Sequence, residues 1–258
     1  MIFTTKRMSF TPHLLIFDTL PTTMLEAKSR ARAGAREGTT ILARAQTSGR
    51  GRLGRTWIAG VDAGIWMTTI LHPPPQRKER FAELSLVVGL AICESVRAMG
   101  VTQAFIKWPN DVLVGDRKLA GILLESDDTT VLAGIGINLA KHDGRDLPAA
   151  IAGRYTGVYD YLPQQTQPDG NELVTRAQAV LASVATWYSR WKRDGFAPMV
   201  LAYDAVDALK DVRVYIAGLD GSAREGTARG VNEHGELIVE TTSGTVIVRA
   251  GEVERVRR

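Results

Sequence analysis

The run of residues 49–57 alternates glycine with arginine and ends in tryptophan. It reads Gly49-Arg50-Gly51-Arg52-Leu53-Gly54-Arg55-Thr56-Trp57. Glycine lets the backbone adopt positive φ and lie close to a ligand, and arginine presents a planar, permanently charged fork that suits phosphate and carboxylate. The run therefore predicts a loop that becomes ordered around an anion. The simpler alternative is a solvated basic loop without a ligand.

The glycine spacing in this loop also matches G-x-G-x-x-G, the fingerprint of dinucleotide-binding folds. That fingerprint needs a strand before it, a helix after it and an acidic residue about 20 positions further on. A strand-like run precedes the loop at 40–43, but residues 57–64 include two glycines and show no helical period. The side chains within the loop are bulky cations, whereas a dinucleotide turn presents bare backbone. We therefore reject a dinucleotide fold and retain the anion-binding loop.

Three further segments combine polar residues or glycine with apolar strand-like runs. They are Lys107-Trp108-Pro109-Asn110-Asp111, Arg117-Lys118-Leu119-Ala120-Gly121 and Gly134-Ile135-Gly136-Ile137-Asn138. The first leaves an amide and a carboxylate at a strand end, and the second places Lys118 near a glycine that allows close backbone approach. In the third, two glycines thin one strand face so that something flat can lie on it. An edge turn, a solvent-exposed lysine and a bulge are the alternatives. With the arginine loop, the three segments predict a site floored by a sheet.

Composition limits the class of protein. The chain has 258 residues, of which 45% are hydrophobic and 23% charged, so it can form one large domain or a large and a small one. A net charge of +4 and a pI of 9.3 favour anionic partners without specifying nucleic acid. The single cysteine, Cys93, excludes an intramolecular disulfide and a multi-cysteine zinc cluster. Because it lies on an apolar helical run, we expect a buried hydrophobic residue.

Nothing in the sequence suggests export or membrane insertion. Residues 1–7 contain no sustained apolar region, as a signal peptide would require. No run of about 18 apolar residues occurs anywhere, so no membrane span is expected. We therefore predict a cytoplasmic location.

Apolar periodicity and turn residues predict the elements that hold these segments. Strands are expected at 13–17, 40–43, 65–71, 105–108, 112–114, 117–125 and 130–138, and helices at 23–33, 81–99 and 172–193. The first helix begins with the Thr-x-x-Glu spacing of a capping box, from Thr23 to Glu26, and ends before Gly34. Residues 141–170 predict a long irregular connection. Since hairpins link the strands of 105–138, we predict an α+β fold with a mixed or antiparallel sheet.

The sequence pattern changes after Asp211, from long helical runs to short strand-like runs. Short strands are expected at 212–216, 223–231, 235–241 and 245–250. Turn residues at 218–221, 232–235 and 243–244 separate them about every 8–12 residues, as in a small all-β barrel. We therefore predict two domains, a catalytic domain at 1–208 and a small barrel at 209–258.

The four motifs, in this order, resemble the biotin protein ligase family. The resemblance covers residues 13–140 and extends more loosely to the end, where that family carries a small Src-homology-like barrel. It implies an α+β catalytic fold related to lipoate ligases. It also implies a two-step reaction in which ATP activates biotin as biotinyl-5'-AMP, and a lysine of a biotin carboxyl carrier protein then displaces AMP. ATP and magnesium would be the cofactors and biotin the substrate.

The resemblance also implies roles for individual residues. Lys118 and Arg52 would neutralise the reacting anions, and Asp111 would hold magnesium, as well as being the one candidate for a base. Trp57 would stack on adenine. The residues implied to bind biotin are Thr22, Thr23, Gln46, Arg50 and Gly121. Those implied to bind ATP or the adenylate are Gly49, Gly51, Arg52, Gly54, Arg55, Trp57, Asn110 and Asn138.

One departure from the family bears on which acid is activated. The family usually has Ser-Thr-Asn at the start of its first helix, where this chain has Thr22, Thr23 and Met24. Two hydroxyls remain and the amide is lost, and a site built to hydrogen-bond its substrate loses discrimination when a partner is missing. A lipoate or fatty-acid ligase on the same fold is therefore the first alternative, and it would need an apolar tunnel at this position.

A biotin-responsive DNA-binding regulator is the second alternative, prompted by the pI and the arginines. Some members of the family carry an N-terminal helix-turn-helix domain. Here about a dozen residues precede the first strand, too few for that three-helix module, so we expect a ligase without it and no specific DNA binding. The sequence leaves the oligomeric state open, with a homodimer as one alternative.

Overall fold

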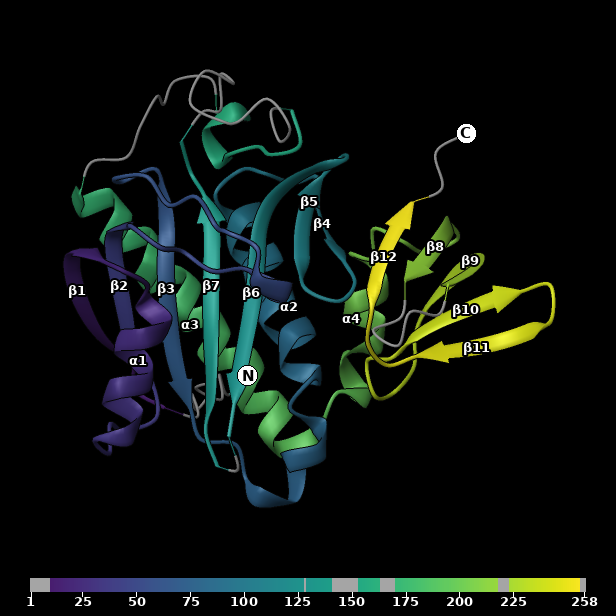
Figure 1. Ribbon diagram of the computed structural model, residues 1–258, viewed down its shortest axis with the longest axis horizontal. Helices are drawn as coiled ribbons and strands as arrows, with labels where there is room; N and C mark the ends of the chain where they lie inside the picture. The colour runs from purple at the N-terminus through teal and green to yellow at the C-terminus, as the bar shows by residue number, and fades with distance from the viewer. Residues whose placement is uncertain (1–9, 128, 141–152, 163–169, 218–222, 256–258) are drawn as a thin grey trace, which may run out of the picture.

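A mixed sheet of seven strands and an antiparallel sheet of five strands form the framework of the computed structural model, which describes residues 10–127, 129–140, 153–162, 170–217 and 223–255 (Figure 1). The large sheet contains β1 (His13–Leu20), β2 (Thr39–Gln46), β3 (Gly64–Leu71), β4 (Ala104–Lys107), β5 (Asp111–Val114), β6 (Arg117–Ser126) and β7 (Val131–Asn138). Its order is β1-β2-β3-β7-β6-β5-β4, and β1 and β2 are its parallel pair. The predicted α+β class with a mixed sheet is confirmed. The predictions for residues 1–7, for the turn at 218–221, and for 141–152 and 163–169 lie outside the described residues.

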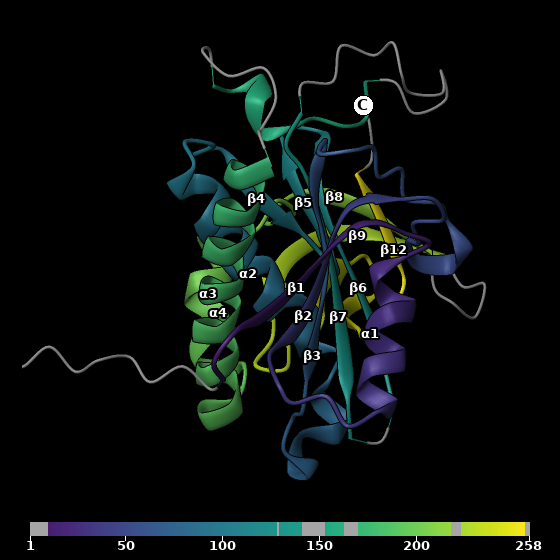
Figure 2. The same ribbon diagram turned by 90° about the vertical axis from the view of Figure 1, so that its left-hand side faces the viewer.

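Helices cover both faces of the large sheet (Figure 2). α1 (Thr23–Arg32) lies on one face, and α2 (Glu83–Ala98) and α3 (Gly170–Asp194) lie on the other; α4 (Val200–Asp204) leads toward the small sheet. α2 is apolar on nearly all sides because it packs between the sheet and α3, and Leu84, Val88 and Ile92 are fully buried. No helix in the described ranges is long and apolar enough to cross a bilayer.

The predicted capping box at Thr23 and Glu26 is wrong. The N-cap is Thr22, whose side chain accepts a hydrogen bond from the backbone N–H of Met24 at 3.3 Å. The Thr23 hydroxyl is held instead by Gln46 on β2 and by the buried Thr68 on β3, and Glu26 pairs with Arg30. Since the Thr23 side chain is committed to the sheet, the helix is capped one residue earlier.

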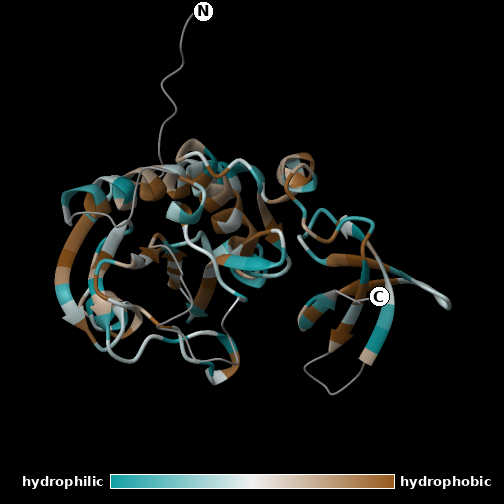
Figure 3. Cartoon of the chain, turned by 90° about the horizontal axis from the view of Figure 1, so that it is seen from above, coloured by the Kyte–Doolittle hydropathy of each residue, from teal (hydrophilic) through white to brown (hydrophobic). Residues whose placement is uncertain are grey.

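The second sheet is formed by β8 (Arg213–Ala217), β9 (Ala223–Val231), β10 (Leu237–Thr241), β11 (Gly244–Val248) and β12 (Glu252–Arg255). All neighbouring strands are antiparallel, in the order β11-β10-β9-β8-β12. The sequence predicts four of the five strands and misses β12, which is charged at three of its four positions. Figure 3 shows this sheet beside the larger one. The division at residue 209 stays a prediction.

The small sheet docks on α2 through the turn between β9 and β10. The Trp108 indole N–H donates to the carbonyl of Gly235 in that turn, at 3.0 Å. Gly235 has φ 69°, and a Cβ there would lie 2.9 Å from a methyl carbon of Leu86 on α2. The turn therefore requires glycine both for its backbone conformation and for its fit against the helix. A continuous apolar core runs across this junction.

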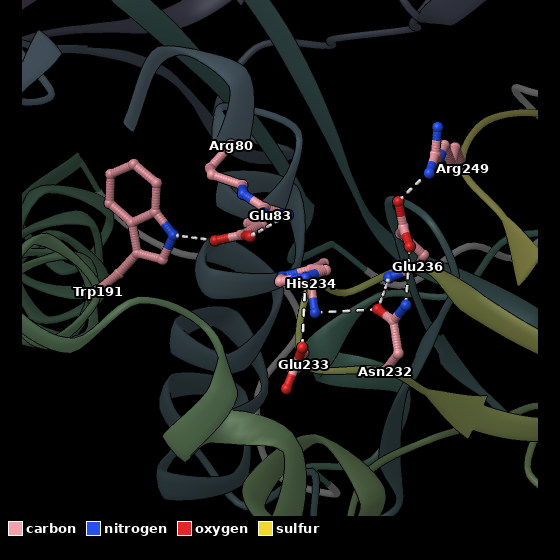
Figure 4. Close-up of polar contacts among 8 residues, drawn as sticks. All are labelled: Arg80, Glu83, Trp191, Asn232, Glu233, His234, Glu236 and Arg249. Carbon is pink, nitrogen blue, oxygen red and sulfur yellow. Dashed lines mark hydrogen bonds and ion pairs between the residues drawn. The ribbon is translucent and has the colours of Figure 1, made fainter. Parts of the chain in front are cut away.

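Polar side chains surround the same junction (Figure 4). Glu83, at the start of α2, is buried, accepts a hydrogen bond from Trp191 Nε1 at 2.6 Å and lies 3.8 Å from Arg80 Nη1. Burial raises the pKa of Glu83. On the side of the small sheet, Asn232 Oδ1 accepts the backbone N–H of His234 at 2.9 Å. The docking turn is thus held by its own hydrogen bonds as well as by its packing.

Asp207 makes the stability of the segment between the sheets depend on pH. It is 9% exposed, its Oδ1 accepts the backbone N–H of Leu209 at 2.7 Å, and its Oδ2 has no partner among the described residues. Burial raises its pKa from 3.8 to about 6. The folded state therefore favours the neutral acid, so its contribution is fully present below pH 3.8 and is lost as pH rises through about 6.

Asp207→Asn should therefore stabilise the protein at pH 8 and make little difference near pH 4. The asparagine amide can keep the bond to Leu209 without a buried charge. The shift of about two pKa units limits the gain to roughly 3 kcal/mol. Urea denaturation of both proteins at pH 4.5 and pH 8 measures it. Equal differences in stability at the two pH values would contradict the assignment.

Candidate active site

An open pocket lies on the large sheet, and its empty space of about 490 Å³ includes open solvent. It is lined by the N-terminus of α1, the end of β2, the arginine loop and the central strands β3, β7 and β6. The residues that the sequence predicts for the site and that line this pocket are Thr22, Thr23, Gln46, Arg50, Gly51, Arg52, Trp57, Asn110, Lys118 and Gly121. The structure thus gathers residues from five separate stretches of the chain.

The other predicted residues lie outside the lining. Asp111 pairs with Lys118, and the side-chain amide of Asn138 is buried and donates to the carbonyls of Lys118 and Thr156 at 3.3 and 3.2 Å. Arg55 is 60% exposed and forms an ion pair with Glu252 of β12. Gly49 and Gly54 shape the loop. Binding roles for these residues stay predictions.

The arginine loop is a tight turn closed by its own backbone. Gly51 N–H donates to the carbonyl of Arg55 at 2.7 Å, and Trp57 N–H donates to that of Gly49 at 2.9 Å. A Cβ on Gly49 would lie 2.3 Å from the Trp57 carbonyl oxygen, so no other residue fits there. The backbone of the loop is thereby held in one conformation.

Arg52 is the more buried of the two loop arginines that line the pocket. Its Nη1 donates to Asn110 Oδ1 at 2.8 Å, and the Asn110 amide in turn donates to the carbonyl of Ile122 at 3.0 Å. Burial is the largest cause that lowers the pKa of Arg52, although guanidinium stays charged in proteins. A desolvated cation favours an anion beside it. The geometry therefore fits a bound phosphate or carboxylate.

Lys118 adds a second cation to the pocket. Its Nζ lies 2.6 Å from Asp111 Oδ1 and 5.2 Å from the centroid of the Trp57 ring. Arg50 also lines the pocket, whereas none of the described lining residues is Asp or Glu. Even with the charge of Asp111 included, this end of the pocket is positive and suits two anions brought together.

Gly121 on β6 and Gly136 on β7 make room for the indole of Trp57. A Cβ on Gly121 would lie 2.9 Å from Trp57 Cζ3, and one on Gly136 would lie 2.7 Å from Trp57 Cε2. The flat group on these strands is therefore a side chain of the protein. Trp57 also packs edge-on against Trp66, and its Nε1 has no partner among the described residues. Stacking of Trp57 on adenine stays a prediction.

Gly136→Ala should displace Trp57 and lower stability by about 1–3 kcal/mol, the usual cost of overpacking. Tryptophan fluorescence and urea denaturation measure the two effects. Gly60→Ala is the matched control, since a Cβ there would meet Ala63 at an ordinary 3.5 Å. If Gly136→Ala and Gly60→Ala had the same fluorescence and stability, the position of the Trp57 side chain would not depend on Gly136.

Several lining residues escape the sequence analysis. They are Met67, Thr68, Ile122 and Leu123. β3 is buried at every position, so no alternation of polar and apolar residues marks which face meets the pocket. Gly134, Ile135 and Gly136 also line the pocket, and they lie in the glycine-rich segment that the sequence predicts as part of the site.

Met24 stands where the resembled family has asparagine. Its terminal methyl would be 2.9 Å from a Cβ on Gly134, and it packs in a small apolar cluster with Ile41, Ile70 and Leu132. The side chain thus fills space against the sheet. The hydroxyl and amide groups at this end come from Thr22, Thr23 and Gln46.

The acidic and metal-ligating residues limit what metal the site could hold. Among the described residues, no group of three or more His, Cys, Asp or Glu side chains could enclose an ion. Magnesium bound with nucleotides takes only one or two carboxylates, and the phosphates and water supply its other ligands. Asp111, which pairs with the lining residue Lys118, could supply one such carboxylate.

Known proteins match nearly the whole chain. Residues 16–141 match the Biotin/lipoate A/B protein ligase family, and residues 211–256 match the Biotin protein ligase C terminal domain. The bifunctional ligase/repressor BirA of Bacillus spizizenii is 31% identical over 251 residues, which cover 94% of this chain and 74% of that protein. The biotin–[acetyl-CoA-carboxylase] ligase of Mycobacterium tuberculosis is 32% identical over 234 residues, which cover 89% and 84%.

A solved structure agrees with these sequence matches. Biotin protein ligase from Aquifex aeolicus in complex with biotin and ATP has a TM-score of 0.81 at 26% identity, covering 96% of this chain and all of that one. The family resemblance carried by the four motifs is thereby confirmed. The chain belongs to the biotin protein ligase family.

Proposed function

We propose that this ligase activates biotin with ATP as biotinyl-5'-AMP and transfers the biotinyl group to a lysine of a biotin carboxyl carrier protein. One observation carries the proposal: a single pocket joins a hydrogen-bonding end, at Thr22, Thr23 and Gln46, to a cationic end, at Arg52 and Lys118. The hydrogen-bonding end suits an uncharged polar ring, and the cationic end suits a carboxylate beside phosphates. Biotin and ATP bound to the Aquifex aeolicus protein support this assignment.

In the first step, a carboxylate oxygen of biotin attacks the α-phosphorus of ATP and pyrophosphate leaves. Both partners are anions, so the barrier falls when cations stand beside them before they meet. Lys118 and Arg52 supply that charge from β6 and from the loop. Asn110 and Asp111 keep the two cations in place through contacts of 2.8 and 2.6 Å.

In the second step, a lysine amine of the acceptor attacks the acyl carbon of the adenylate and AMP leaves with the bonding electron pair. The mixed anhydride must be kept from water until then. The arginine loop covers it, and Asp111 is the carboxylate nearest to Lys118 that could take the proton of the amine.

Magnesium belongs to the proposal as the companion of ATP, where it would screen the phosphate charge. Asp111 would hold it from the protein side.

A cytoplasmic location and a homodimer also stay predictions. Sedimentation of the purified protein measures the oligomeric state.

Exchange of labelled pyrophosphate into ATP tests the function. The purified protein is given biotin, lipoate or octanoate in turn, and exchange is expected with biotin. Exchange with lipoate alone would assign the chain to the lipoate side of the fold instead. Transfer is then followed with a purified carrier domain, whose acceptor lysine should be the labelled residue.

A further inference from the structure

The polar end of the pocket is a chain of hydrogen bonds that starts at a residue with no assigned role. Thr68, on β3, is 1% exposed and its Oγ1 lies 2.8 Å from Thr23 Oγ1. Thr23 Oγ1 lies 3.2 Å from Gln46 Oε1, and the Thr23 backbone N–H donates to the same oxygen at 2.8 Å. Three elements, β3, α1 and β2, thus meet in one network.

The direction of each bond in this network follows from the inventory of donors. A backbone N–H can only donate, so the atom of Gln46 facing Thr23 is its carbonyl oxygen and not its NH₂ group. The Thr23 hydroxyl also donates to that oxygen, which uses its one hydrogen. The bond between the two threonines must therefore run from Thr68 to Thr23.

This fixed direction decides what the pocket presents to a ligand. Gln46 lines the pocket, and its NH₂ group donates to no protein group within the described residues, so it remains available as a pair of donors. The oxygen of Thr23 keeps a free lone pair, so it acts as an acceptor. Donors for one carbonyl oxygen, beside an acceptor for an N–H group, are the complement of a cyclic urea. An alkyl chain could satisfy none of them, and a dithiolane offers only weak sulfur acceptors.

We propose that Thr68 is a positioning residue for biotin: by donating to Thr23, it fixes the direction of the Thr68–Thr23–Gln46 network and so makes the pocket selective for a ureido ring. The proposal rests on the proposed function. Thr68 acts through its neighbours, since its hydrogen is used within the protein.

Thr68→Val removes the hydroxyl and keeps the branched shape. The KM for biotin should rise about 3- to 10-fold, the size of one neutral hydrogen bond, while kcat and the KM for ATP stay within about twofold. The KM for desthiobiotin, which keeps the ureido ring and lacks the sulfur ring, should rise by the same factor. Thr68→Ser restores the hydroxyl and should restore the KM.

Thr69→Val is the matched control. Thr69 is the next residue of β3, is also fully buried and shares a similar bond with Thr40, at 3.0 Å, but it does not line the pocket. Its KM for biotin should equal that of the wild type. An unchanged KM in Thr68→Val, an equal rise in Thr69→Val, or no recovery in Thr68→Ser would each overturn the proposal. If the wild type shows no biotin-dependent exchange, the proposed function itself fails.

Discussion

Arg52→Gly should let biotinyl-5'-AMP escape before transfer, so that the variant biotinylates lysines of bystander proteins. Arg52 is the loop arginine that is half buried in the pocket and held by Asn110 at 2.8 Å. Loss of a charged hydrogen-bond partner costs about 1.5–3 kcal/mol, which corresponds to release about 10- to 100-fold faster. Adenylation should continue, since Lys118 still provides a cation beside the phosphates.

Labelling of an unrelated, lysine-rich protein in the presence of biotin and ATP measures the escape. Arg55→Gly makes the same change in the same loop, at a side chain that pairs with Glu252 and does not line the pocket. We expect that variant to stay specific for the carrier protein. Arg52→Ala separates loss of charge from added flexibility. Weaker binding of biotin without bystander labelling would show that Arg52 binds substrate but does not retain the intermediate.

Much of the fold follows from local patterns. Apolar periodicity predicts α2 and α3, and hairpin turns predict β4 to β7, because these features depend on neighbours in sequence. The capping box at Thr23 is wrong for the opposite reason. Its hydroxyl is engaged by Gln46 and Thr68, which lie 23 and 45 residues away, and no local rule can anticipate such a competitor.

The site residues also divide into those that the sequence predicts and those that depend on distant contacts. Arginine, lysine and glycine in short motifs stand out by type, and most of them do line the pocket. Thr68 does not stand out, because a threonine in a fully buried strand has the composition of ordinary core. Nor could spacing show that Arg55 turns toward Glu252, since that contact depends on how the second sheet docks.

Lys118→Ala should reduce adenylation by about 100- to 1,000-fold, the usual effect of removing one group that stabilises developing charge. Its Nζ stands at the cationic end of the pocket, beside Asp111 and over the Trp57 ring. The fold should persist, because the backbone of Lys118 keeps its bonds to Arg154 and Thr156, at 2.8 and 3.0 Å. Pyrophosphate exchange measures the loss, and thermal denaturation checks the fold.

Supplying the intermediate separates the two chemical steps. If Lys118 acts mainly in adenylation, the Lys118→Ala protein given synthetic biotinyl-5'-AMP should transfer biotin to the carrier domain at nearly the wild-type rate. An equal loss in both steps would instead assign Lys118 to AMP, which is present in each. The double variant with Asp111→Asn removes the carboxylate that Lys118→Ala leaves unpaired. Recovery of adenylation there would mean that the unpaired charge of Asp111, and not the missing cation, causes the loss; we expect no recovery, because two anions still have to meet without the lysine.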